Sequence, residues 1–170
     1  MFEDEENEHQ KTETLPIYKK GREIIDLVRQ IADLIPDDGS QLASIKHDML
    51  QDAYMLCAKI ANAEGGDMYD LRMENAAIIR KSAHSLMIQY HSLEMFGFEH
   101  VEYFLVVRKQ IEEFRLLFIP WVASFDKQNY RIDRWGLFNP PGIGPFDVDI
   151  DEGLGRNIDF FDEEDEEDED

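Results

Sequence analysis

Four segments of helical periodicity organise the apolar residues of this sequence. Their limits are Pro16 to Pro36, Gln41 to about Glu64, Asp67 to Gly97, and Val101 to Phe125. Apolar residues recur every three to four positions in each segment, which is typical of an amphipathic helix. The connections are short, so consecutive helices must lie antiparallel beside one another. The sequence therefore predicts an all-α fold, an antiparallel up-down-up-down four-helix bundle, and no strand pattern competes with it.

Local signals mark where these helices begin and end. Ser40 is placed to cap the second helix and Asp67 to cap the third. Gly97 favours the left-handed backbone that ends a helix. Pro120 lies inside the fourth segment and should kink or end the helix near Ile119, because its ring removes a backbone donor and clashes one turn back.

The sequence on either side of the helical segments has a different character. We assign residues 15–127 to one bundle domain, since hydrophobic residues make up 43% of the 170 and suffice for a single core. Residues 128–146 are aromatic and rich in Pro and Gly, which predicts an irregular arm. Residues 1–14 and 147–170 are acidic, and we expect both to be disordered because like charges repel.

The net charge of -21 belongs mostly to the two acidic ends. Residues 1–14 carry about -5 and residues 147–170 about -13, which leaves the part between them almost neutral. Such carboxylate runs commonly only solubilise a chain. The alternative is that the run imitates a nucleic acid toward a basic partner, or covers the chain's own basic face, with Phe160 and Phe161 as an apolar foothold.

Catalytic and metal chemistry find no support in the sequence. The single cysteine, Cys57, forms no intramolecular disulfide, which agrees with a reducing compartment. His84, His91 and Glu94 share one helix face, but the Glu-x-x-His pairs of di-iron bundles are missing from the helical segments. Nucleophile and nucleotide-binding motifs are missing too. We therefore expect a non-enzymatic protein without a cofactor or metal.

No apolar run approaches the 18 residues that a membrane span needs, and the first residues are acidic where a secretory signal would be basic and then apolar. The sequence predicts a cytoplasmic protein that does not enter a membrane.

The junction of the second and third helices carries a motif that resembles a known family. The residues Ile60-Ala61-Asn62-Ala63-Glu64-Gly65 resemble the Asn-Ile-Ala-Glu-Gly signature of four-helix bundle proteins encoded in 23S rRNA intervening sequences. A second set resembles that family's third helix and following turn: Ala83, Leu86, Gln89, Leu93, Gly97, Phe98, Tyr103 and the run from Ile111 to Leu117. The resemblance spans roughly residues 17–125.

The resemblance implies a left-handed bundle that assembles into a ring, commonly a pentamer. The accessory protein of diversity-generating retroelements is similar, and its ring binds a reverse transcriptase and RNA. Two departures stand out: those accessory proteins are basic, and the arm after residue 127 is not part of the family's pattern. We therefore expect a homo-oligomer with a protein partner, and RNA or a reverse transcriptase as the alternative partner.

The arm supplies the predicted partner-binding residues. They are large apolar groups on irregular backbone: Trp135, Leu137, Phe138 and Phe146. Two interpretations stay open, because these side chains either fold back onto the chain's own bundle or anchor in a partner or sister subunit.

Basic residues on the helices are the candidates for nucleic-acid binding, which would then weaken steeply with salt. They are Lys19, Lys20, Arg22, Arg80, Lys81, Arg108, Lys109 and Arg115. The simpler interpretation is an ordinary charged outer face. Arg80 and His84 also resemble the Arg…His pair of HEPN-type ribonucleases, although three residues separate them instead of four to six.

Three functional hypotheses follow. The first is a non-enzymatic oligomeric scaffold or adaptor with the arm at an interface. The alternative is an accessory factor that holds RNA or a reverse transcriptase against basic helix faces. The weaker alternative is a HEPN-like ribonuclease that uses Arg80 and His84.

Overall fold

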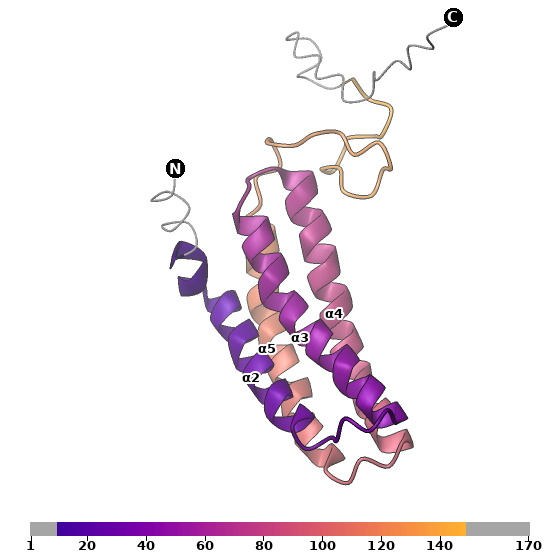
Figure 1. Ribbon diagram of the computed structural model, residues 1–170. Helices are drawn as coiled ribbons and strands as arrows, with labels where there is room; N and C mark the ends of the chain where they lie inside the picture. Colours follow the sequence, from indigo (N-terminus) through magenta and orange to yellow (C-terminus); the bar gives the residue numbers. More distant parts are fainter. Residues whose placement is uncertain (1–9, 149–170) are drawn as a thin grey trace, which may run out of the picture.

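The structure, a computed structural model, describes residues 10–148 (Figure 1). Its helices are α2 (Pro16–Ala32), α3 (Gln41–Glu64), α4 (Tyr69–Met95), the 3-10 helix η1 (Val101–Tyr103) and α5 (Phe104–Ala123). Between residues 10 and 148 no strand is present, so the predicted all-α class is confirmed.

The helical part begins before the predicted boundary at residue 15. Residues 10–14 are helical, and Thr12 among them is buried. The sequence assigns these residues to the acidic arm, but they contain one Lys and one Glu and so lack the like-charge repulsion that argues for disorder. The disorder predicted for residues 1–9 and 149–170 concerns residues outside the described part.

The four long helices lie side by side (Figure 1). α2 packs on α3 and α5, α4 also packs on both of these helices, and the contact between α3 and α4 is the most extensive. The α2–α3 and α4–α5 connections lie at one end of the molecule (Figure 1). The α3–α4 connection and the residues after α5 lie at the opposite end, which we call the arm end.

Apolar stripes from all four helices meet in one core. Each stripe turns inward because burying apolar area is the largest favourable contribution to folding. The following members have no exposed surface: Ile24, Val28, Met49, Leu56, Ile60, Ile79, Leu86, Leu93, Phe104 and Val107.

Two of the predicted helix-end signals are confirmed. The Ser40 side chain accepts a hydrogen bond from the Ala43 backbone N at 3.3 Å and caps α3. At the end of α4, Gly97 has φ +75°, and its N donates to the Glu94 carbonyl at 3.1 Å. Phe98 N donates to the Leu93 carbonyl at 2.9 Å, which completes a Schellman motif.

Two other predicted helix ends are wrong. Met68 is the N-cap residue of α4, not Asp67, and no side chain caps this helix. Its Tyr69 N donates instead to the Asn129 carbonyl at 2.7 Å. Pro120 does not end α5 at Ile119, because the helix continues to Ala123. Burial of Trp121 beyond the proline holds this last turn against the core.

α2 and α3 approach closely at Gly21. A Cβ atom added there would lie 2.7 Å from the Cys57 Sγ. This sulfur donates to the Tyr18 carbonyl at 3.6 Å, and burial raises the pKa of the Cys57 thiol to about 11. Gly21 is therefore required for the packing of these two helices, although it weakens α2 itself.

We expect Gly21→Ala to lower the free energy of unfolding by about 1–2 kcal/mol, because overpacking outweighs the gain of about 1 kcal/mol from better helix propensity. In a Cys57→Ala background the sulfur is gone, and the same substitution should become neutral or stabilising. Denaturant unfolding of the four proteins measures both effects. Equal effects in the two backgrounds would show that the contact with sulfur does not limit the packing.

Candidate functional site

One carboxylate joins three helices at the arm end. Glu64, the last residue of α3, accepts a hydrogen bond from Trp121 Nε1 of α5 at 2.9 Å. The same Oε1 atom forms an ion pair with Arg72 of α4. The Arg72 guanidinium also lies 4.3 Å from the centre of the Phe125 ring, a cation–π contact. These contacts fix the position from which the chain leaves α5.

The chain after α5 is then tied to the beginning of α4. Asn129 accepts the hydrogen bond from Tyr69 N, and the Asp70 side chain accepts one from Arg131 N at 3.0 Å. Ile132 is buried beside them. Residues 129–132 therefore form a fixed base for the arm.

Asp133 organises the next six residues. Its carboxylate accepts three backbone hydrogen bonds, from Trp135 N at 2.9 Å, Leu137 N at 2.8 Å and Phe138 N at 2.9 Å. Asn139 closes the loop, because its side chain accepts from Asp133 N at 2.7 Å and donates to the Asp133 carbonyl at 2.9 Å. The amides of Phe138 and Trp135 stabilise the charged form and lower the pKa of Asp133.

The second half of the arm folds back on the first. Arg134 donates to the Pro145 carbonyl at 3.1 Å and to the Asp147 carbonyl at 2.8 Å. Gly136 has φ +74°, and a Cβ there would lie 3.4 Å from the Pro145 ring. The arm is therefore an ordered loop, although it contains no regular secondary structure between residues 128 and 148.

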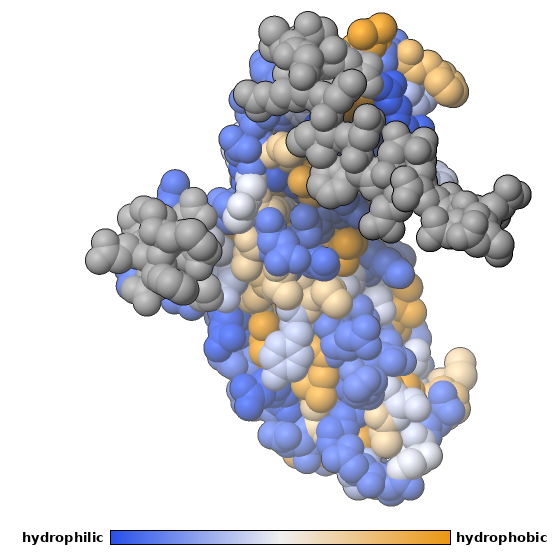
Figure 2. Space-filling view, turned by 45° about the horizontal axis from the view of Figure 1, so that its top comes forward, coloured by the Kyte–Doolittle hydropathy of each residue, from blue (hydrophilic) through white to orange (hydrophobic). Residues whose placement is uncertain are grey.

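This loop turns large apolar side chains toward solvent. Trp135 is 91% exposed, Leu137 75% and Phe146 95%, and Val148 is exposed as well. We call these four residues the arm surface. Figure 2 shows apolar side chains at the arm end of the molecule. The interpretation that the predicted residues fold back onto the chain's own helices is wrong for Trp135, Leu137 and Phe146, and only Phe138 is partly buried.

A cleft of about 560 Å³ lies between the arm and α4. Leu71, which is half exposed, lines it from α4, and Trp135 and Leu137 line it from the arm. Two residues of the arm surface, Trp135 and Leu137, therefore border a hollow beside α4.

The predicted basic residues are distributed over three helices. Lys19, Lys20 and Arg22 lie on α2, and Lys20 is held by Glu113 at 2.9 Å and Glu23 at 2.5 Å. The other five lie on the neighbouring helices α4 and α5: Arg80, Lys81, Arg108, Lys109 and Arg115. Arg115 pairs with Glu112, and Arg108 lies over the Tyr90 ring.

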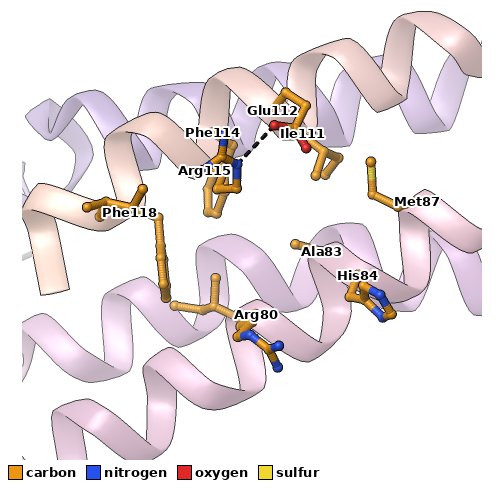
Figure 3. A pocket seen from close by; sticks show the side chains of 11 residues that line it. Arg80, Ala83, His84, Met87, Ile111, Glu112, Phe114, Arg115 and Phe118 are labelled. Carbon is orange, nitrogen blue, oxygen red and sulfur yellow. Dashed lines mark hydrogen bonds and ion pairs between the residues drawn. The ribbon is translucent and has the colours of Figure 1, made fainter.

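Arg80 and His84 line a groove of about 390 Å³ between α4 and α5 (Figure 3). The sequence places these two residues one turn apart but does not predict the groove. α4 and α5 make less contact with each other than the other neighbouring long helices do. Spacing between helices depends on tertiary packing, so periodicity along one helix carries no signal for it.

The remaining site predictions concern metals, membranes and relatives. Among residues 10–148, no group of three or more His, Cys, Asp or Glu side chains is arranged to hold a metal ion. Within the same residues, no helix is long and apolar enough to cross a membrane.

Comparisons with protein-family models, curated proteins and solved structures found no match to this chain. The resemblance to the 23S rRNA intervening-sequence family therefore stays a prediction.

We expect Asp133→Ala to release the loop, because three backbone amides lose their shared acceptor. Hydrogen exchange of the Trp135, Leu137 and Phe138 amides should accelerate roughly tenfold or more, because hydrogen bonds to a charged acceptor are stronger than neutral ones. The control Asp67→Ala removes an exposed carboxylate from the α3–α4 connection and should leave these amides protected. Unchanged exchange in Asp133→Ala would mean that other contacts hold the loop.

The same carboxylate should make the loop acid-sensitive. Because the pKa of Asp133 is lowered in the folded loop, its hydrogen bonds are fully present above the ordinary aspartate pKa of about 3.9 and are lost as pH falls through the lower folded value. An NMR titration of the Asp133 carboxyl carbon measures this midpoint. A midpoint at or above the ordinary value would contradict the hydrogen-bonding pattern.

Proposed function

We propose that this chain is a non-enzymatic scaffold or adaptor that self-associates through the arm surface. The observation that carries the proposal is the ordered loop that holds Trp135 and Phe146 more than nine-tenths exposed. When a partner covers an apolar side chain that is exposed in this way, the free energy of the system falls, so such side chains mark interaction surfaces.

The free energy available from burying these side chains is sufficient for specific association. Aromatic side chains bury about 150–250 Å² each, and about 25 cal/mol per Å² converts this area into several kcal/mol for each residue. Such residues commonly dominate an interface. The Asp133 carboxylate already orders the loop, so association loses little further conformational entropy.

We propose further that the helical part is an up-down-up-down four-helix bundle like that of the 23S rRNA intervening-sequence proteins, and that its copies form a closed ring. The packing of each long helix on two neighbours supports this architecture. A reducing, cytoplasmic location suits the buried thiol of Cys57. The predicted protein partner would then bind a ring that presents several copies of one helical surface.

Removing the arm's side chains tests the proposal. We expect the double variant Trp135→Ala, Leu137→Ala to weaken self-association by roughly thirtyfold or more, the effect of losing one interface hot spot. The control is Met95→Ala, which truncates a 77% exposed side chain at the opposite end of α4. Sedimentation velocity over a range of micromolar concentrations measures the dissociation constants.

Two results would count against the proposal. A wild-type chain that stays monomeric at every concentration has no self-association to explain. Assemblies that persist unchanged in the double variant place the interface elsewhere on the molecule. If Met95→Ala also weakens the assembly, then general loss of surface hydrophobicity is responsible and the arm surface has no special role.

A further inference from the structure

The central part of α4 carries positive charge only. Residues 75–93 contain Arg80 and Lys81 and no carboxylate, in a chain whose net charge is -21. Arg80 is exposed and forms no ion pair with any residue between 10 and 148. Arg80 and Lys81 therefore have no acidic neighbour along the central part of α4.

The groove between α4 and α5 opens beside this charge (Figure 3). Its lining is mostly apolar and includes Ile79, Met87 and Phe118, and Arg80 stands at its α4 edge. Arg115 stands at the α5 edge. The ion pair between Arg115 and Glu112 is 2.9 Å long but half exposed, so it holds Arg115 only weakly. A ligand for this groove should be apolar in the middle and acidic at both sides.

The chain itself contains such a segment. Phe160 and Phe161 stand between Asp159 and Asp162, and carboxylates continue from there to residue 170. We propose that Phe160 and Phe161 dock in the α4–α5 groove of their own chain, with the flanking carboxylates against Arg80 and Arg115. The two aromatic rings match the apolar lining, and the carboxylates match the basic edges.

The connecting chain is long enough for this contact. Eleven residues lie between Val148 and Phe160, which gives a reach of up to about 40 Å. The arm is tied to Tyr69, and Ala83 follows 14 positions later on α4, a rise of about 21 Å. A tether whose length matches the distance to be spanned gives a millimolar effective concentration, so even weak binding suffices to occupy the groove.

Occupancy has a consequence for binding by other molecules. The docked tail covers Arg80 at the edge of the groove, and it carries the charges that a phosphate backbone would otherwise supply. RNA or another polyanion must displace the tail before it can bind α4. The contact is intramolecular and does not depend on self-association through the arm surface.

A labelled peptide of residues 156–170 tests the proposal on the full chain. The peptide should bind the double variant Phe160→Ala, Phe161→Ala, whose own segment no longer fills the groove. It should bind the wild-type chain roughly tenfold more weakly, because the tethered segment competes. Adding Arg80→Glu to the double variant should remove binding, whereas adding Arg22→Glu, on the exposed side of α2, should not.

A second measurement follows the groove directly. The Met87 methyl NMR signal should differ between the wild-type chain and the Phe160→Ala, Phe161→Ala variant, and adding the peptide to the variant should move it toward the wild-type position. The proposal is overturned if the peptide binds neither protein or binds both equally. Equal loss of peptide binding with Arg80→Glu and with Arg22→Glu also overturns the proposal. A Met87 chemical shift that depends on protein concentration overturns it as well, because a second copy of the chain would then occupy the groove.

Discussion

The carboxylate of Glu64 is the contact on which the geometry of the arm end depends. It is largely buried and binds Arg72 of α4 and Trp121 of α5, so three helices meet at one oxygen atom. Removing either partner would leave a charge or a polar group buried without compensation, which costs far more than the pair gains by forming. The beginning of α4 and the last turn of α5 are therefore held together, and the base of the arm rests on both.

From this junction a series of polar contacts orders residues that have no regular structure. Asn129 and Arg131 attach to the first turn of α4, and Asp133 then holds the loop that follows. Backbone amides that a helix or strand would satisfy are satisfied here by one side chain. The result is an irregular segment with fixed side-chain directions, in which exposure of Trp135 comes from the backbone rather than from a lack of order.

The sequence predicts the features of this protein that depend on neighbouring residues. Helical stripes, the Ser40 cap and the Gly97 stop all follow from local periodicity or backbone preference, and the structure contains them. The helix ends predicted from Asp67 and Pro120 are wrong because tertiary contacts determine where those helices begin and end. Asp133 had a signal in the sequence, an acid before a Gly-containing turn with Asn139 shortly after, but its role depends on which amides come within reach. The sequence contains no signal for the α4–α5 groove.

The close approach of α2 and α3 also affects how the chain behaves toward oxidants. With the pKa of the Cys57 thiol near 11, only about one molecule in ten thousand carries the reactive thiolate at neutral pH. The sulfur is also packed beneath Gly21 and is nearly inaccessible. Copies of the folded chain should therefore not become linked by disulfides in air, and any assembly that they form rests on noncovalent contacts that dilution reverses.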